Sequence, residues 1–257
     1  ESIGLCEIEN KKVLTDLIYN TALKSYGYGI AHFESRDRRG IDVGLLYQKD
    51  KVALINSQKI LIDFPWDKNY YTRDILWATF ALKQDTFHVF VNHWPSRWRG
   101  QLETEQSRMF VAQTLRKVTD SLYENNSLVK IIVMGDFNDN PTNASFKKVL
   151  KSKKNRESVG LKGLYNPMEG FFKAGLGSNA YRDAWSLFDQ ILVTQPLLEE
   201  DFSSFRFYKA GIFNKQFLIS KKGRYKGYPF RSFSYGGFTG GYSDHFPVYV
   251  HVIKEVE

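Results

Sequence analysis

Apolar residues recur along the chain in short runs rich in β-branched and aromatic side chains. Such runs, bounded by turn-forming residues, are typical of β-strands. Short polar turns, such as Lys49-Asp50 and Lys83-Gln84-Asp85, separate several of them, which favours antiparallel pairing. The strands that we expect span residues 2–6, 28–33, 42–47, 52–62, 73–82, 87–94, 131–134, 191–193 and 246–253.

Other segments carry apolar residues at the spacing of an amphipathic helix. The clearest is 101–125, where Val111, Leu115, Val118 and Leu122 form an apolar stripe. We expect this helix to cover one face of a sheet and to carry no chemistry. Shorter helices are expected over residues 10–24 and 143–151, and residues 165–184 are expected to be irregular because they are rich in Gly and aromatic residues.

Composition favours one globular domain over residues 1–257. The chain has 257 residues, of which 42% are hydrophobic, and it contains no internal repeat, low-complexity tract or Pro/Gly/Ser-rich linker. No apolar stretch approaches the roughly 20 residues that a membrane-spanning helix needs, so we expect no transmembrane segment. The single cysteine, Cys6, excludes an internal disulfide and leaves the compartment undecided.

The net charge of +8 favours a polyanionic partner such as nucleic acid, a phosphorylated metabolite or anionic lipid. The charge is concentrated between residues 206 and 231, a span with eight basic residues, several interleaved aromatics and no acid. Aromatic rings among cations suit a nucleotide or a single-stranded backbone. A strand pair with a solvated basic edge explains the same pattern equally well.

Polar side chains repeatedly follow buried strands. Glu7 follows the first strand and Asn92-His93 closes the strand at 87–94, next to Arg97. Asp136 and Asn138 come directly after the most apolar run, 131–134. Carboxylate and amide oxygens suit a hard divalent cation, and a histidine can hold a phosphate oxygen or protonate a leaving group. Each is also common at ordinary strand ends, so no one of them decides the function.

Two further acids stand at strand starts. Asp189 enters the core strand at 191–193 and needs a strong partner there, for which His245 is our candidate. Asp42 opens another strand, either exposed or paired, and the sequence does not choose.

Taken in order, these motifs resemble the endonuclease/exonuclease/phosphatase superfamily, in a bacterial branch. The resemblance rests on Glu7 after a strand, Asn92-His93, Gly135-Asp136-Phe137-Asn138, Asp189 before a strand, and Ser243-Asp244-His245. It implies an α/β four-layer sandwich of two packed mixed β-sheets flanked by helices, as in pancreatic deoxyribonuclease, with strand-end loops lining one active cleft.

The resemblance also implies roles for individual residues. Glu7 and Asp244 would bind Mg²⁺, with Mn²⁺ or Ca²⁺ as alternatives. His93, Asp136, Asn138, Asp189 and His245 would be catalytic, with Asp136 orienting the attacking water or holding a second cation and His245 acting as general base or phosphate clamp. Substrate would contact Asn92, Arg97, Arg39 and Arg231, and Asp42 would orient His93.

One feature departs from the family. Its members begin with a strand that ends in an Asn, upstream of the glutamate, whereas this chain starts at Glu1 just before the glutamate motif. We therefore expect the natural protein to be longer at its N-terminus. Any signal for secretion or periplasmic export would lie in that part, so localisation stays unknown.

The leading hypothesis is a Mg²⁺-dependent phosphodiesterase or nuclease, active as a monomer on a phosphate ester, with DNA and RNA among the candidates. A phosphatase or phosphodiesterase acting on a small molecule or lipid headgroup is the first alternative, because the catalytic residues do not separate the two. A non-catalytic module that binds phosphate or nucleic acid on the same fold is the second.

Overall fold

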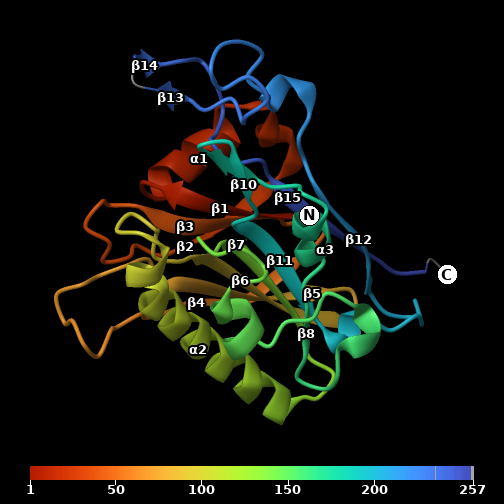
Figure 1. The fold of residues 1–257 in the computed structure, drawn as a ribbon. Helices are drawn as coiled ribbons and strands as arrows, with labels where there is room; N and C mark the ends of the chain where they lie inside the picture. Colours follow the sequence, from red (N-terminus) through yellow and green to blue (C-terminus); the bar gives the residue numbers. More distant parts are fainter. Residues whose placement is uncertain (235, 256–257) are drawn as a thin grey trace.

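Two β-sheets pack face to face in the computed structural model, which describes residues 1–234 and 236–255 (Figure 1). The first sheet is antiparallel and has the strand order β1-β3-β2. Its strands are β1 (Ser2–Ile8), β2 (Tyr28–His32) and β3 (Asp42–Gln48).

The second sheet is mixed and has the order β4-β5-β6-β7-β11-β8. The parallel pair β6–β7 is joined by the long helix α2 (Gln101–Asn125), as a parallel connection requires. The strands are β4 (Ala53–Ile60), β5 (Ile75–Leu82), β6 (Asp85–His93), β7 (Lys130–Asp136), β8 (Leu164–Tyr165) and β11 (Asp189–Thr194).

Smaller elements complete the chain. An antiparallel pair is formed by β12 (Arg206–Ile212) and β15 (Val248–Ile253). Two hairpins are β9–β10 (Asn179–Tyr181, Ala184–Ser186) and β13–β14 (Phe233–Ser234, Gly237–Phe238), the latter at the upper edge of Figure 1. The short helices are α1 (Lys11–Tyr19) and α3 (Met168–Lys173), with 3₁₀ turns at Ala22–Tyr26, Arg156–Ser158, Gln195–Leu197 and Gln216–Leu218.

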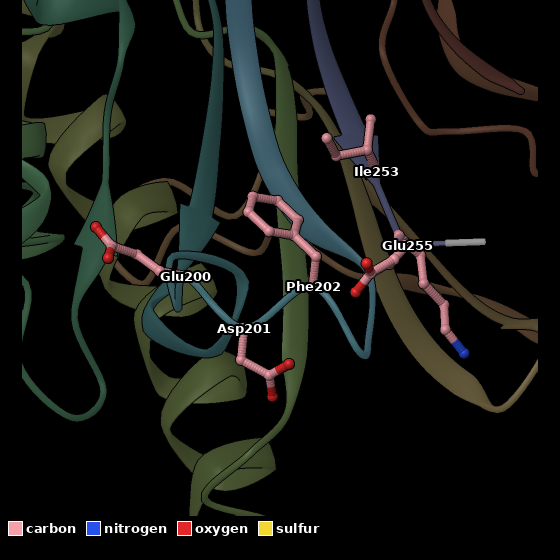
Figure 2. A pocket seen from close by; sticks show the side chains of 6 residues that line it. Glu200, Asp201, Phe202, Ile253 and Glu255 are labelled. Atoms are coloured by element: carbon pink, nitrogen blue, oxygen red, sulfur yellow. The ribbon is translucent and has the colours of Figure 1, made fainter. Parts of the chain in front are cut away.

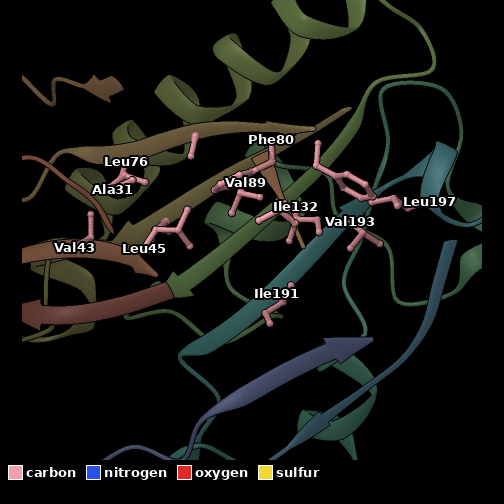
Figure 3. Close-up of a cluster of buried hydrophobic side chains, with 14 of the residues drawn as sticks. Ala31, Val43, Leu45, Leu76, Phe80, Val89, Ile132, Ile191, Val193 and Leu197 are labelled. Carbon is pink, nitrogen blue, oxygen red and sulfur yellow. The ribbon is translucent and has the colours of Figure 1, made fainter. Parts of the chain in front are cut away.

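The main core lies between the two sheets (Figure 3). Ala31, Val43 and Leu45 of the first sheet contact the cluster that includes Leu76, Val89, Ile132 and Ile191 of the second. Valines of β15 and Phe207 of β12 pack against the same cluster. Burial of this apolar surface is the dominant force that holds the sheets together.

Helices cover the outer faces. Val111, Ala112 and Leu115 of α2 pack on Ile131 and Val133 of the second sheet. On the outside of the first sheet, Leu14 and Ile18 of α1 contact Tyr28 and Leu46. The four layers of helix, sheet, sheet and helix confirm the expected fold class. No helix in residues 1–234 and 236–255 has the length and apolar character needed to cross a bilayer.

Two expected helices differ from the structure. The expected helix over 10–24 stops at Tyr19, because the Thr21 hydroxyl accepts the Leu23 N–H and starts a separate 3₁₀ turn. The expected helix over 143–151 is a single π-helical turn, Ser145–Val149. Helix α2 has the expected bounds. The first part of the basic segment, β12, pairs with β15, in agreement with the interpretation of that segment as part of a strand pair.

A buried ion network ties the loop after β7 to helix α2. The Asp139 carboxylate lies 2.8 Å from Nε of the fully buried Arg108 and 3.0 Å from an Nη atom of Arg97, and it accepts a hydrogen bond from the Ser145 hydroxyl at 2.7 Å. The Nε–H of Arg108 makes no well-aligned hydrogen bond of its own. The Asp139 carboxylate therefore compensates the buried positive charge of Arg108.

Replacing Asp139 by Ala should lower the free energy of unfolding by about 3–5 kcal/mol, because it leaves Arg108 buried and uncompensated. Urea denaturation followed by tryptophan fluorescence measures this. As a control, Asp120→Ala removes a partly exposed carboxylate paired with Arg116 within the same helix and should cost less than about 1 kcal/mol. Equal losses for the two variants would contradict the role given to the buried pair.

Candidate active site

Three titratable residues stand side by side where strands of the second sheet meet. His93 ends β6, Asp136 ends β7 and Asp189 begins β11. The register places Asp136 opposite His93 on one side and opposite Asp189 on the other. Neighbouring strands lie about 4.8 Å apart, so the sheet itself gathers these groups at one rim.

The backbone around Asp136 adopts unusual conformations. Gly135 has φ +139°, and a Cβ there would lie 1.9 Å from the Asn92 carbonyl oxygen, so this position requires glycine. Asn138 has φ +49°, and its backbone N–H donates to Oδ1 of Asp136 at 2.8 Å. The Gly-Asp-Phe-Asn sequence thus forms a tight turn that fixes the Asp136 carboxylate.

His245 pairs with Asp189, as expected from the sequence. Nδ1 of His245 lies 2.7 Å from Oδ2 of Asp189, and the Ser178 hydroxyl donates to the same oxygen at 2.6 Å. Burial lowers the pKa of His245, but the charge and hydrogen bond of Asp189, with the charges of Asp136 and Asp244, raise it to about 10. His245 is therefore an imidazolium at neutral pH.

Asp136 and His93, the other two groups of the row, also have shifted pKa values. Burial, together with the neighbouring Asp189 charge, raises the pKa of Asp136 to about 6, although the His245 charge opposes this. Burial and the charges of Arg73, Arg39 and His245 hold the pKa of His93 well below its usual range. Nε2 of the neutral His93 lies 3.7 Å from Oδ2 of Asp136, too far for a hydrogen bond.

Glu7 approaches the same rim from the first sheet. Its neighbour Cys6 donates through Sγ to the carbonyl oxygen of Asn92, the residue before His93. Glu7 has φ +59° and lies where the β1–β3 register shifts between Cys6 and Ile8, the mark of a β-bulge. Its side chain is exposed. The bulge therefore redirects a carboxylate at the end of a strand, as bulges beside functional sites often do.

Asp244 lies next to His245 and contacts a cation. An Nη atom of Arg231 donates to Oδ2 of Asp244 at 2.7 Å, and both side chains are about half exposed. Burial alone would raise the pKa of Asp244, but the charges of His245 and Arg231 bring it below the ordinary value. Arg231 belongs to residues 213–242, which we call the basic arm because it contains six Lys and Arg residues and no acid.

Several other sequence-predicted site residues make contacts within the protein. The Asn92 amide is fully buried, donating to the Met134 carbonyl and accepting from the Trp94 indole N–H. Arg97 donates to the Asn138 carbonyl at 2.7 Å and also pairs with Asp139. These contacts suit residues that shape the site. Arg39 remains half exposed, with Nε 3.4 Å from Asp37.

Asp42 pairs with His32, not with His93. Its Oδ2 lies 3.0 Å from Nε2 of His32, and its Oδ1 accepts the Ser35 N–H at 2.7 Å. Both carboxylate oxygens are thus engaged away from His93. The Asp42 side chain therefore fixes the loop that follows His32, and its backbone lies opposite Ile8 in the β-ladder.

Sequence reasoning missed two groups that organise the row. Ser178, which holds Asp189, comes from the stretch expected to be irregular. The buried Arg73 donates to the carbonyls of His93 and Trp94 at 3.1 and 2.5 Å and to Asp37 at 2.9 Å. A basic residue just before a strand of apolar residues was a visible signal for Arg73, whereas no local pattern marks Ser178.

The donor chemistry of the site fits a hard divalent cation. The exposed Glu7 and the half-exposed Asp244 carry carboxylate oxygens, the kind of ligand that Mg²⁺ prefers. Within residues 1–234 and 236–255, no three His, Cys, Asp or Glu side chains are already gathered as a metal cluster. A cation held by these two carboxylates would therefore need water and phosphate oxygens, which Mg²⁺ commonly retains.

A cavity of about 480 Å³ lies at the opposite end of β15, away from Asp244 and His245 (Figure 2). Three acids, Glu200, Asp201 and Glu255, line it with one lysine, Lys254, beside Phe202 and Ile253. Its carboxylates would repel a phosphate group, so it does not compete with the strand-end row as the site for a phosphoric ester.

NMR titration of the His245 ring should show an imidazolium up to about pH 10, whereas His93 should stay neutral well below pH 6.5. Asp189→Asn removes the carboxylate charge that raises the pKa of His245 most, and should lower that pKa by more than one unit. Ser178→Ala is the control that keeps the carboxylate charge and should shift it less. A wild-type His245 that titrates near 6.5 would contradict this electrostatic description.

Comparison with known proteins identifies the family and the fold. The chain matches the model of the "Endonuclease/Exonuclease/phosphatase family" over residues 1–254, and no curated protein matches its sequence. Among solved structures, TDP2 of D. rerio complexed with a single-strand DNA product is similar, with TM-score 0.60, 17% identity, and coverage of 98% of this chain and 85% of that one.

Two further structures share the fold. A mannosyl-6-phosphatase of Bacteroides thetaiotaomicron has TM-score 0.58, 17% identity, and coverage of 98% and 85% of the two chains. The catalytic domain of human Nocturnin with bound sulfate has TM-score 0.55, 16% identity, and coverage of 81% and 72%. With the family model spanning nearly its whole length, the chain belongs to the endonuclease/exonuclease/phosphatase family, whose enzymes hydrolyse phosphoric esters.

Proposed function

We propose that this protein is a Mg²⁺-dependent phosphodiesterase, with nucleic acid as the leading substrate class. The observation that carries the proposal is the row of His93, Asp136 and Asp189 in strand register, with His245 bonded to Asp189. In this proposal the row would provide a proton acceptor, a fixed cation and a neutral hydrogen-bond donor within one rim. In-line displacement at phosphorus needs these three functions.

Asp136 is the best candidate for the proton acceptor. With its pKa raised to about 6, its carboxylate is mostly ionised at neutral pH yet more basic than an ordinary aspartate. It would take a proton from the attacking water as the water oxygen bonds to phosphorus. The ester P–O bond breaks, and the leaving oxygen departs with the bonding electrons and takes a proton from solvent. His245, already protonated, would bind a phosphate oxygen as a cation and not act as a general base.

His93 and Asn138 would complete the phosphate-binding surface. The neutral His93 can donate one N–H, and the orphaned Nδ1 shows that its ring has unused hydrogen-bonding capacity among the described residues. The Asn138 side-chain amide donates one N–H to the Trp94 carbonyl at 3.0 Å and has a second N–H to donate. Donors of this kind stabilise the charge that develops on the phosphoryl oxygens.

Glu7 and Asp244 would hold the cation, with Mn²⁺ or Ca²⁺ as substitutes for Mg²⁺. A bound divalent cation neutralises phosphate charge and so favours the approach of water. The half-exposed Arg39 and Arg231 would contact the substrate outside the reacting phosphate. Asn92, Arg97 and Asp42 would position the loops that carry these groups.

The basic arm favours a polyanionic substrate. Lys215 and Arg224 lie over the rings of Phe213 and Tyr225, and Phe217, Phe233 and Phe238 are exposed. Cations and exposed aromatic rings together suit a single-stranded nucleic acid. The fold is also shared with a phosphatase that acts on a mannosyl phosphate, so a small-molecule phosphatase is the alternative. A panel of single-stranded DNA, RNA, sugar phosphates and phospholipid headgroups separates these substrate classes.

With Mg²⁺, the wild-type protein should hydrolyse a generic diester such as bis-p-nitrophenyl phosphate, and EDTA should abolish the activity. Asp136→Ala and His245→Ala should each lower kcat by roughly 10²–10⁴-fold, because each removes a proton acceptor or a charge made for the transition state. Steady-state kinetics measures this.

His251→Ala is the matched control, since it removes an exposed histidine from β15 and should leave kcat within about twofold. Full activity in EDTA would refute the cation, and unchanged kcat in Asp136→Ala would refute the assigned site. Phosphate binding with no hydrolysis in any form would point to a binding module.

A further inference from the structure

Arg231 is presented to Asp244 by a rigidly bonded part of the basic arm. The Arg231 carbonyl accepts the Thr239 hydroxyl, and the adjoining Phe230 is bonded through its N–H to Leu218 and through its carbonyl to Tyr242. A Cβ on Gly241 would lie 2.3 Å from the Arg231 carbonyl oxygen, so the returning chain must be glycine there. These contacts hold the Arg231 backbone beside Asp244 at the site rim.

The place that Arg231 occupies conflicts with the cation site. Its guanidinium donates to Oδ2 of Asp244 at 2.7 Å, and Asp244 is one of the two carboxylates that we assign to a divalent cation. A guanidinium and a divalent cation repel each other at such a short distance. Arg231 and the divalent cation therefore weaken each other's binding to the Asp244 carboxylate.

We propose that Arg231 exchanges partners, leaving Asp244 for a phosphate oxygen of the substrate when a divalent cation binds Asp244. This inference rests on the proposed function, because it takes the cation and the phosphate from it. Before cation binding, Arg231 neutralises Asp244. After cation binding, the released guanidinium offers the planar, paired donors that suit a phosphate group.

The exchange makes cation binding and phosphate binding cooperative through one side chain. A cation must displace Arg231, which weakens cation binding by the strength of a half-exposed ion pair. Phosphate then gains a donor that was previously engaged, and by linkage each ligand strengthens the other. A plain phosphate-binding arginine would contribute to phosphate affinity whether or not the cation is bound.

The first test is Mn²⁺ binding to the full chain without substrate, measured by isothermal titration calorimetry. Arg231→Gln should bind Mn²⁺ about three- to fivefold more tightly than the wild type, because Asp244 no longer has a competing partner. Arg224→Gln removes the same charge from the same arm, at a residue that contacts the ring of Tyr225, and should change the affinity less than about 1.5-fold.

A double-mutant cycle assigns the effect to Asp244. In an Asp244→Asn background, Arg231→Gln should no longer tighten Mn²⁺ binding, because the exchange partner is missing. Tightening of the same size in both backgrounds would show a general charge effect and would overturn the proposal.

The second test is binding of inorganic phosphate with and without saturating Mg²⁺. With Mg²⁺, Arg231→Gln should weaken phosphate binding about tenfold; without Mg²⁺, the change should be less than twofold. Equal weakening in both conditions would overturn the exchange, as would Mn²⁺ affinity that is unchanged or weaker in Arg231→Gln. A wild type that binds no Mn²⁺ would remove the proposed cation site and the exchange together, whereas intact binding without hydrolysis would remove the proposed catalysis alone.

Discussion

The Asp136 carboxylate is taken out of water between a neutral imidazole and a second carboxylate, and the other features of the rim compensate for that burial. An isolated buried carboxylate would take up a proton. Here the Asn138 backbone N–H, the His245 imidazolium and the nearby Arg73 guanidinium all favour its ionised form. The balance leaves the Asp136 pKa near 6, where a carboxylate is both charged and basic at neutral pH.

This balance depends on strand register more than on any single bond. The parallel β6–β7 pair places His93 beside Asp136, and the antiparallel β7–β11 pair places Asp189 on the other side. A shift by one residue would turn each side chain to the opposite face of the sheet. The apolar residues on both faces, such as Ile132 toward the first sheet and Val133 toward α2, fix that register. The packing of the core therefore also fixes the positions of the site residues.

Local patterns were enough to find the main strands, helix α2 and most of the row, but not helix α3 or strand β9, which lie in the stretch expected to be irregular. Apolar runs ending in Asp136 or His93 marked the strands, and the need of Asp189, at the entry to a core strand, for a partner led to His245. What escaped the sequence were contacts chosen by the tertiary fold. Nothing near Asp42 indicates that its partner is His32 and not His93, and nothing near Arg97 shows that Asp139 and Asn138 engage it. Ser178 reaches Asp189 from a stretch whose irregular composition carries no periodic signal.

The roles of Glu7 and Asp244 can be tested directly by a crystal structure of the protein grown with Mn²⁺ and inorganic phosphate. Anomalous scattering should locate one Mn²⁺ within about 2.3 Å of carboxylate oxygens of both residues. The phosphate should lie against the His245 ring, next to the buried Asp136 carboxylate. A cation bound elsewhere, or phosphate held away from His245, would contradict the assignment of this rim as a phosphoester hydrolase site.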